Sequence, residues 1–295
     1  MEKPVIGLVG TGVMGKSMAR NLMQAGYTLN IFTRTKEKAE ELLKEGANWQ
    51  SSVRTLAEQS DVILTIVGYP EDVESVYFDD EGILQHARPG TYLIDMTTSS
   101  PKLAERISMA AQEKSLHALD APVSGGDVGA KNGTLSIMVG GDDADFASVL
   151  PVFEVMGGNI VLQGPAGAGQ HTKLCNQIAI AAGMMGVVEA VLYAEQAGLD
   201  PHRVLQSIES GAAGSWSLSN LAPRMIAGNF APGFYVKHFI KDMKLAIESA
   251  EQLNVPVPGL TLAKQLYDKL SENGGDNDGT QALYKYYKMT MSPNH

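Results

Sequence analysis

The first fifteen residues constrain the fold of this chain more than any other stretch. An apolar run of strand length, residues 4–9, ends at Gly10, and further glycines follow at positions 12 and 15 in the spacing G-x-G-x-x-G. After this turn, apolar residues recur at the spacing of one helix face: Val13, Met14, Met18, Leu22 and Met23. The pattern predicts a strand, a tight turn and a helix whose first N–H groups can bind the phosphates of a dinucleotide.

The same glycines also fit a second nucleotide-binding motif. Residues 10–17 match G-x-x-x-x-G-K-S, the loop that holds phosphates in P-loop NTPases. Asp95, which closes the apolar run 92–94, could then bind the magnesium ion. A P-loop places a longer loop before its lysine, whereas the helical pattern here begins at Val13, ahead of Lys16. The local pattern therefore favours a dinucleotide site and leaves the P-loop as its alternative.

The composition is typical of a globular protein with two domains. The 295 residues carry a net charge of −10, which argues against nucleic acids and acidic membranes as partners. The single cysteine, Cys175, excludes an internal disulfide and a cysteine-based zinc cluster. The sequence shows neither a basic-then-apolar leader nor an apolar run approaching the ~20 residues that span a membrane. We therefore expect a soluble cytoplasmic protein that binds no membrane.

Strand-like and helix-like segments alternate through the first half of the chain. Strands are predicted at residues 27–32, 61–67 and 91–95, with helices between them, and this alternation indicates an α/β fold with a doubly wound parallel sheet. From residue 165 the pattern is helical, and it begins with a long apolar helix that we expect to be buried on most of its faces. We predict a dinucleotide-binding domain over residues 1–164 and an all-α domain over residues 165–295.

The end of the predicted strand 27–32 bears on the choice of cofactor. In a dinucleotide fold this strand end lies over the adenosine ribose, where an acidic residue selects NAD(H). The chain has no acid there and offers the hydroxyls of Thr33 and Thr35 and the guanidinium of Arg34. Because arginine binds phosphate through charge-assisted, bidentate hydrogen bonds, we predict NADP(H), with NAD(H) as the alternative.

Three further strand ends carry candidate ligand contacts. Ligands of such sheets bind beyond the carboxyl ends of the strands, which directs attention to Val67-Gly68, to Thr98 and to residues 120–126. In the last of these, Ser124 supplies a hydroxyl, and the two glycines that follow let backbone N–H groups converge. These residues suit a substrate carboxylate, and a flexible turn is the alternative.

Polar residues share one face at the start of the long helix. Lys173, Asn176 and Gln177 stand at offsets of three and four. A lysine at the N-terminal end of a helix is unfavourable for the macrodipole, so we expect an anionic ligand or a catalytic role to favour Lys173. A solvated lysine is the alternative. The histidines, His295 among them, show no metal-ligand spacing, and we predict no metal site.

Together these segments resemble the β-hydroxyacid dehydrogenase family, which includes 3-hydroxyisobutyrate dehydrogenase, tartronate semialdehyde reductase and glyoxylate/succinic semialdehyde reductase. The resemblance spans essentially the whole chain and rests on the order of its motifs, at residues 10–15, 120–126, 167–176 and 241–242. It implies a Rossmann domain, a long interdomain helix and a helical second domain that commonly forms the oligomer interface. It therefore predicts a homodimer or homotetramer, and it favours the dinucleotide site over the P-loop.

The resemblance also implies roles for individual residues. Lys173 matches the catalytic lysine. Substrate contacts match Ser124, Gly125, Gly126, Asn176, Gln177, Phe234 and Asp242. Cofactor contacts match Gly10, Thr11, Gly12, Val13, Met14, Gly15, Thr33, Arg34, Thr35, Val67, Gly68, Thr98 and Lys241. The chain departs from its relatives at three positions, with Gly68 for a proline, Gln177 for a second asparagine, and Thr33 for the asparagine of the NADPH-using aldehyde reductases.

The function that follows is reduction of a small aldehyde acid, of the semialdehyde or glyoxylate type, to its hydroxyacid, or the reverse reaction. Lys173 would act as the general acid or base, with NADP(H) as the hydride carrier. An NAD-dependent dehydrogenase of the 3-hydroxyisobutyrate type is the alternative within the family. An imine reductase is a further rival, but the relatives of that enzyme usually lack the lysine. A catalytically silent cofactor-binding protein is the alternative of another class.

Overall fold

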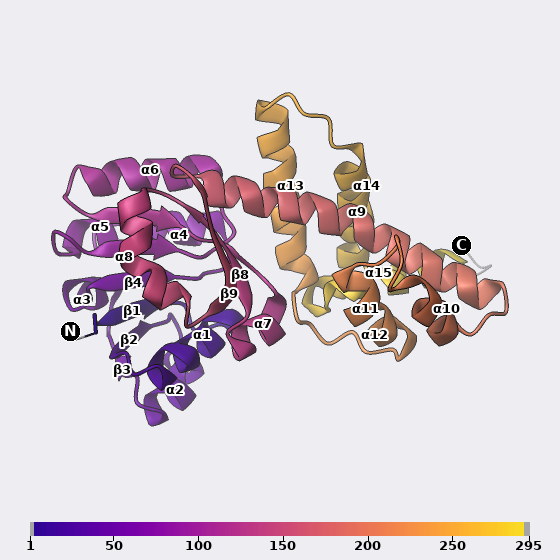
Figure 1. The fold of residues 1–295 in the computed structure, drawn as a ribbon, viewed down its shortest axis with the longest axis horizontal. Helices are drawn as coiled ribbons and strands as arrows, with labels where there is room; N and C mark the ends of the chain where they lie inside the picture. Colours follow the sequence, from indigo (N-terminus) through magenta and orange to yellow (C-terminus); the bar gives the residue numbers. More distant parts are fainter. Residues whose placement is uncertain (1–2, 292–295) are drawn as a thin grey trace. The chain divides into compact units, whose positions relative to one another are not determined.

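The computed structural model describes residues 3–291 (Figure 1). The chain divides into two compact units, Met1–Lys173 and Leu174–His295. The division falls inside one long helix, whereas the boundary predicted from the sequence lies ahead of that helix. Each unit has a hydrophobic core of its own and is described by itself below.

The first unit is built on a nine-stranded, mostly parallel sheet with the order β3-β2-β1-β4-β5-β6-β8-β7, in which β9 pairs with β8. Strands β1 to β6 pair in parallel, as predicted. Within this mostly parallel sheet, β8 runs antiparallel to β6 and β7. The strands are β1 (Ile6–Val9), β2 (Leu29–Phe32), β3 (Asn48–Trp49), β4 (Val62–Thr65), β5 (Tyr92–Asp95), β6 (His117–Asp120), β7 (Val123–Ser124), β8 (Leu135–Gly140) and β9 (Gly157–Gly164).

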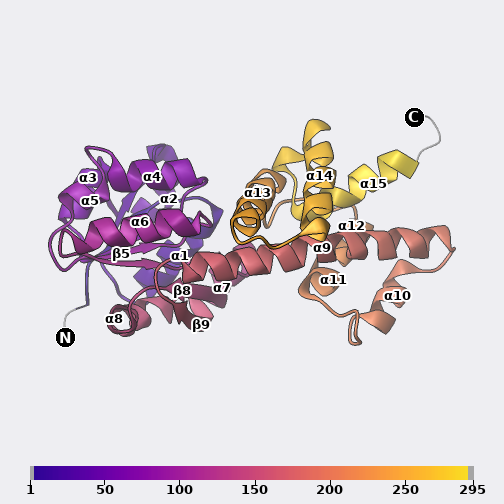
Figure 2. The same ribbon diagram turned by 90° about the horizontal axis from the view of Figure 1, so that it is seen from above.

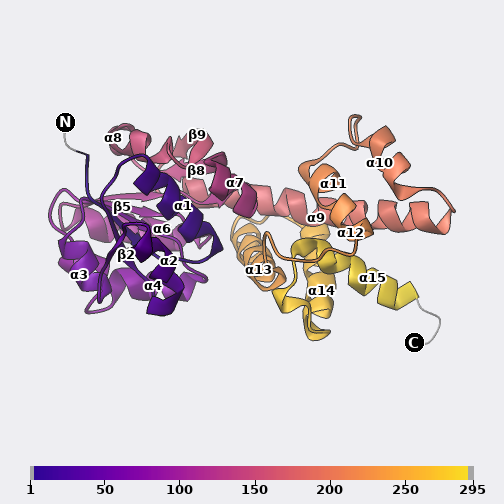
Figure 3. The ribbon, with the colours of Figure 1, turned by 90° about the horizontal axis from the view of Figure 1, so that it is seen from below.

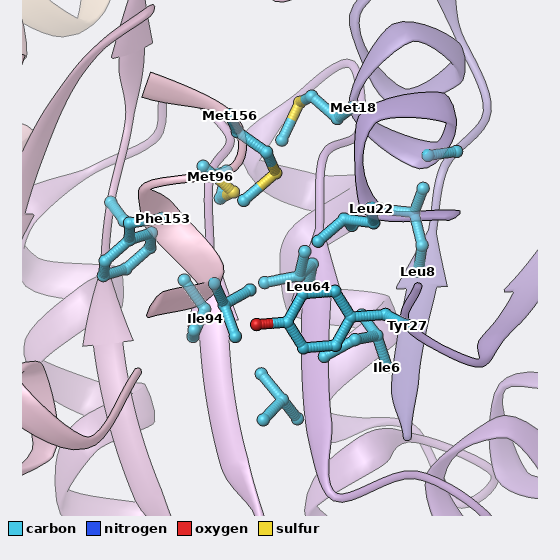
Figure 4. Packing of buried hydrophobic residues seen from close by; sticks show 14 of the residues in the cluster. Ile6, Leu8, Met18, Leu22, Tyr27, Leu64, Ile94, Met96, Phe153 and Met156 are labelled. Atoms are coloured by element: carbon cyan, nitrogen blue, oxygen red, sulfur yellow. The ribbon is translucent and has the colours of Figure 1, made fainter. Parts of the chain in front are cut away.

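Helices cover both faces of this sheet because its strands are apolar on both sides. In β1, Ile6 and Leu8 belong to one core cluster with residues of α1 and α8, and Figure 4 shows part of this packing. Val9 belongs to a second cluster, formed with α3, α4, α5 and α6. Figure 2 shows α3 and α4 on the side of the sheet opposite α8. The helices are α1 (Val13–Gln24), η1 (Lys36–Ala39), α2 (Glu40–Lys44), α3 (Val53–Glu58), α4 (Pro70–Phe78), α5 (Ile83–His86), α6 (Pro101–Gln112), α7 (Gly126–Asn132) and α8 (Asp143–Phe153).

The strand register brings three sequence-distant segments to one edge of the sheet. Thr65, the last residue of β4, pairs with Asp95 at the end of β5, and Asp95 pairs with Asp120 at the end of β6. The segments that follow these residues therefore leave the sheet side by side. The predicted cofactor and carboxylate segments of this unit begin there, as expected for a parallel sheet.

The second unit is helical. Its helices pack around the C-terminal part of α9 (Ala168–Gln196), with α10 and α11 on one side and α13 and α14 on the other (Figures 2 and 3). The elements after α9 are α10 (Pro201–Ile208), α11 (Trp216–Asn220), α12 (Ala222–Ile226), α13 (Val236–Gln252), α14 (Pro258–Glu272), η2 (Gly275–Asn277), η3 (Thr280–Ala282) and α15 (Leu283–Met291).

Helix α9 corrects two expectations from the sequence. It is long and apolar enough to cross a membrane by length and composition alone, although we expected no such segment. Its buried face, which includes Met184 and Val188, packs into the core of the second unit, so we interpret α9 as a core helix. The second correction concerns burial. The helix is not buried on most faces, because Ile180 and Tyr193 are 36% and 75% exposed.

Candidate functional site

The glycine turn between β1 and α1 has the geometry of a phosphate-binding cradle. Gly10 has a φ of +103°, and a Cβ there would lie 2.1 Å from the carbonyl oxygen of Ile66. A Cβ on Gly15 would lie 2.1 Å from the carbonyl oxygen of Gly10. At Gly12, by contrast, a Cβ would meet no atom within 4 Å. The outer two glycines therefore permit close packing of the turn, and the middle one leaves its outer side open, as a bound pyrophosphate requires.

The start of α1 favours a dinucleotide over a P-loop. The helix begins at Val13, its N-cap Gly12 provides no side-chain cap, and its first turn holds no acid. Its first N–H groups can therefore bind an anion. The hydroxyl of Thr11 is buried and has no hydrogen-bond partner among the described residues. Lys16, which a P-loop would use on phosphate, lies 3.5 Å from the Glu41 carboxylate. These residues fit the diphosphate of NAD(P).

The adenosine end of the predicted cofactor site contains an exposed arginine. β2 ends at Phe32, and Arg34 follows with a side chain that is 83% exposed. Its Nη1 donates to the Asp72 carboxylate at 3.0 Å, and the same carboxylate accepts from the Tyr69 N–H at 3.2 Å. Asp72 thus holds Arg34 beside the start of α4. Positions 33–35 hold no acidic residue, and the choice between NADP(H) and NAD(H) stays a prediction.

At the predicted nicotinamide end, Thr97 uses its hydroxyl, N–H and carbonyl groups to hold neighbouring segments. Its hydroxyl accepts from the Val67 N–H at 3.0 Å, and its own N–H donates to the Asp95 carboxylate at 3.0 Å. Its carbonyl accepts from the Gln170 side chain at 2.8 Å. Thr97 is 2% exposed, whereas the next residue, Thr98, is partly exposed. The structure therefore brings Val67 and the Thr98 segment together, as predicted for two parts of one site.

Asp95 is buried in a polar network beneath this segment. Its carboxylate also accepts from the Thr65 hydroxyl at 3.0 Å, and that hydroxyl lies 3.1 Å from the Tyr77 hydroxyl. Burial raises the pKa of Asp95 to about 6, although hydrogen bonds from Thr97 and Thr65 act in the opposite direction. The neighbouring Asp120 raises the pKa of Asp95 further. The donors of this network come from the protein itself, which does not support Asp95 as a magnesium ligand.

The predicted carboxylate loop joins β7 to α7. Ser124 ends β7, and Gly125 and Gly126 have φ values of +128° and +63°. Both glycines are thus in backbone conformations that other residues adopt only with strain. Gly125 is the N-cap of α7 and has no side chain to bond the first N–H groups of the helix, whose first turn also contains the acidic Asp127. The conformation suits the predicted contact with a carboxylate.

Asp120 anchors the start of α9 to the sheet. Its two carboxylate oxygens accept from the N–H groups of Gly167 and Gln170, both at 2.7 Å. Burial raises the pKa of Asp120, and these N–H groups and the nearby His171 oppose that shift. α9 begins at Ala168, so Lys173 lies in the second turn and not at the helix end as we expected. The argument from the macrodipole therefore does not apply to Lys173, since that effect fades beyond the first turn.

Lys173 is nevertheless in an unusual environment. Lys173 is only 6% exposed, which contradicts the alternative of a solvated lysine. Lysine is rarely buried to this extent in proteins, because its ammonium group is costly to remove from water. A buried lysine on the helix that Asp120 anchors is a candidate proton donor.

In the second unit, the predicted substrate contacts form one hydrogen-bonded cluster. The Asn176 amide donates to the side-chain oxygen of Gln177 at 2.8 Å, and the Gln177 amide donates to Asp242 at 2.6 Å. Lys241 pairs with the other oxygen of Asp242 at 2.9 Å. Phe234 packs its ring on Phe239, with ring centroids 5.7 Å apart. Gln177 and Asp242 are buried, so the longer glutamine at position 177 joins Asn176 to the Lys241–Asp242 pair.

Two residues with evident positioning contacts were missed by the sequence analysis. Gln170 is fully buried and bonds the Thr97–Ser99 backbone, and Asp120 was treated as part of a loop rather than as a helix cap. A signal for Gln170 existed, because it stands three residues before Lys173 on the same helix face. Among residues 3–291 no group of three or more His, Cys, Asp or Glu could hold a metal ion; His295 lies outside the described residues.

Both units match known protein families. Residues 5–164 match the NAD binding domain of 6-phosphogluconate dehydrogenase. Residues 167–287 match the family described as NAD-binding of NADP-dependent 3-hydroxyisobutyrate dehydrogenase. Together these matches include the glycine turn, the carboxylate loop and all of α9.

Individual proteins resemble the chain over nearly its whole length. It is 61% identical over 285 residues to the uncharacterized oxidoreductase YkwC of Bacillus subtilis, covering 97% of this chain and 99% of that protein. It is 40% identical to 2-hydroxy-3-oxopropionate reductase of Escherichia coli, covering 98% of each. Among solved structures, 3-hydroxyisobutyrate dehydrogenase of Mycobacterium tuberculosis with L-serine matches with a TM-score of 0.88 at 30% identity, covering 99% of this chain and 100% of that one.

The raised pKa of Asp95 predicts how stability depends on pH. An acid whose pKa is higher in the folded state stabilises the fold at low pH, and this contribution is lost as the pH rises through the folded value. Between pH 4 and pH 7, Asp95 alone is expected to lower the free energy of unfolding by about 2 kcal/mol. Asp95→Asn should remove this part of the pH dependence, as measured by urea unfolding across that range.

The exposed Asp80 offers a matched control, because Asp80→Asn changes the same group outside the network. Its unfolding free energy should follow that of the unchanged protein at every pH. Parallel pH profiles for Asp95→Asn and the unchanged protein would contradict the raised pKa.

Proposed function

We propose that this chain, which belongs to the β-hydroxyacid dehydrogenase family, is an NADP(H)-dependent oxidoreductase that reduces a small aldehyde acid to its hydroxyacid or catalyses the reverse reaction. The observation that carries the proposal is the burial of Lys173 in the second turn of α9. A lysine in this setting can serve as a proton donor or acceptor for a reacting oxygen.

Each part of the chain would contribute one task to the reaction. The turn Gly10–Gly15 would hold the cofactor diphosphate, and the Ser124–Gly126 loop would bind the substrate carboxylate. Bound NADP(H) supplies the hydride. Lys173 would donate a proton to the oxygen of the aldehyde as it becomes a hydroxyl, and would accept that proton in the reverse direction. Correct placement of reactants can lower the barrier by ~7–11 kcal/mol, and general-acid help adds roughly 10²–10⁴-fold.

The names of two similar proteins support a substrate with its reacting oxygen on the third carbon. The Escherichia coli relative is named for 2-hydroxy-3-oxopropionate, and the Mycobacterium tuberculosis structure contains L-serine. Both molecules are three-carbon acids with an oxygen substituent on carbon 3. We therefore rank tartronate and methylmalonate semialdehydes ahead of glyoxylate and succinic semialdehyde as substrates for this chain.

A substrate panel and one variant test this function. The purified protein should oxidise NADPH with at least one of the four aldehyde acids named above. Lys173→Met should lower kcat by roughly 10²–10⁴-fold, because the proton donor is lost, while the Kd for NADPH from fluorescence titration stays unchanged.

The exposed Lys114, whose ammonium bonds the Gln85 side chain, gives a matched lysine control. Lys114→Met should retain full turnover. Near-normal turnover in Lys173→Met would reject the assignment of the proton donor. Absence of turnover with every substrate, together with normal NADPH binding, would favour the catalytically silent alternative. Turnover of cyclic imines in place of aldehydes would favour an imine reductase.

We further propose that Arg34 selects NADP(H) over NAD(H). The guanidinium is 83% exposed at the end of β2, and its partner Asp72 is an exchangeable surface contact, since ion pairs of this kind contribute little to stability. A 2′-phosphate carries more charge than the Asp72 carboxylate and accepts bidentate hydrogen bonds from arginine. The alternative to this cofactor preference is an NAD-dependent dehydrogenase.

Arg34→Ala should lower kcat/KM for NADPH roughly ten- to hundredfold and change that for NADH little, because hydrogen bonds to charged groups contribute ~1.5–3 kcal/mol. Asp72→Asn is the matched variant, because it frees the same guanidinium without removing it. Its kcat/KM for NADPH should equal or exceed that of the unchanged protein. An unchanged ratio of NADPH to NADH efficiency in Arg34→Ala would contradict the proposed selection.

We also propose a cytoplasmic homodimer or homotetramer that forms through the helical unit. Support comes from the exposed apolar residues of that unit, which include Tyr193, Leu199 and Trp216 at 75%, 53% and 59% exposure. Light scattering after size-exclusion chromatography should give a mass at least twice 31.5 kDa. A monomer at micromolar concentration would contradict the assembly, and recovery in the membrane fraction of lysed cells would contradict the location.

A further inference from the structure

A buried glutamine joins the helix of the proposed proton donor to the loop of the proposed nicotinamide contact. Gln170 is 0% exposed. Its side-chain oxygen accepts from the Ser99 N–H at 2.8 Å, and its side-chain nitrogen donates to the Thr97 carbonyl at 2.8 Å. These two hydrogen bonds hold the backbone in place on either side of Thr98. All of these residues belong to the first unit.

The chemistry of this contact requires an amide. The side chain must accept with one atom and donate with another, and only the amides of asparagine and glutamine do so at every pH. The other polar groups of Thr97 are already used by Val67 and Asp95, so the loop has little freedom to find a replacement for Gln170. Loss of the amide would leave a buried N–H and a buried carbonyl unpaired, which is costly.

The same residue also anchors α9 through its backbone. The Gln170 N–H donates to Asp120 at 2.7 Å, so the first turn of the helix is held at the end of β6 while the side chain holds the loop after β5. Lys173 follows three residues later, which places it on the same helix face one turn further on. Gln170 therefore links the backbone beside Thr98 to the helix that carries Lys173.

We propose that Gln170 is a positioning residue for the reaction, which keeps Thr98 and Lys173 in register so that hydride and proton reach the same carbonyl group. This inference rests on the proposed function of Lys173 and on the predicted contact of Thr98 with the nicotinamide. It assigns Gln170 no contact with substrate. Its loss would disturb the geometry of the transition state more than the binding of either ligand.

The first test is the near-isosteric Gln170→Met. We expect kcat to fall on the order of 100-fold, because small misplacements of reacting groups have effects of this size. The Kd for NADPH should change less than threefold, because the cradle at Gly10–Gly15 is untouched. The isotope effect on kcat with deuterated NADPH should increase, because hydride transfer becomes slower than the other steps.

The second test is Gln170→Glu, which carries its own pH signature. A protonated glutamic acid donates and accepts as the amide does, whereas a glutamate can only accept and would face the Thr97 carbonyl. The ratio of kcat for this variant to kcat for the unchanged enzyme should therefore rise as the pH falls. The ratio for Gln170→Met should not depend on pH. The pH dependence of the Gln170→Glu ratio can be measured even if Gln170→Met is poorly folded.

Asn30→Leu is the matched control for the loss of a buried amide. Asn30 is 5% exposed in the same unit, and its side chain bonds Gln59 and Ser60, which precede β4. We expect it to lower the Tm, as Gln170→Met does, and to leave kcat within threefold. An unchanged kcat in Gln170→Met, a pH-independent ratio for Gln170→Glu, or an equal loss of kcat in Asn30→Leu would overturn the positioning role. Absence of turnover in the unchanged protein would instead overturn the proposed function.

Discussion

The interaction on which the first unit depends most is the capping of α9 by Asp120. The carboxylate ends β6, and its oxygens accept from the N–H groups of Gly167, just before the helix, and of Gln170 in the first helical turn. The approach is close enough that a Cβ on Gly140 or Gly169 would lie 2.4 Å or 2.8 Å from these oxygens. A helix start joined to a strand end in this way has little freedom to rotate or slide. The contact therefore helps to orient the first turns of α9, which include Lys173.

A second constraint is that the buried polar groups at the strand ends are hydrogen-bonded to one another. Asp95, Thr97 and Gln170 form a continuous set of hydrogen bonds beneath the partly exposed Thr98. Burial of such groups is tolerated only where each finds a partner, and here the partners come from β4, β5 and α9. A rigid base of this kind can present a ligand-binding segment without relying on the ligand to order it. The raised pKa of Asp95 is a consequence of the same burial.

Much of the fold could be predicted because local patterns were strong. The glycine turn, the buried strands β1, β4 and β5 and the long helix all carry clear periodicity, and the family matches confirm the oxidoreductase fold. Short or exposed elements were harder to predict. β3 has only two residues, which is too short to show a pattern. In β9 and α9, several apolar side chains are exposed, so the rule that apolar residues are buried fails there. The antiparallel placement of β8 depends on pairing partners that are distant in sequence.

The sequence by itself determined the dinucleotide turn, the order of the elements and the residue types available for chemistry, because each of these depends on neighbours within a few positions. Only the tertiary structure decided which polar groups face one another. It showed that Arg34 pairs with Asp72, that Gln177 reaches Asp242, and that Gln170 grips the loop around Thr98. These pairings join residues dozens of positions apart. They arise from strand register and helix packing, which no local pattern encodes.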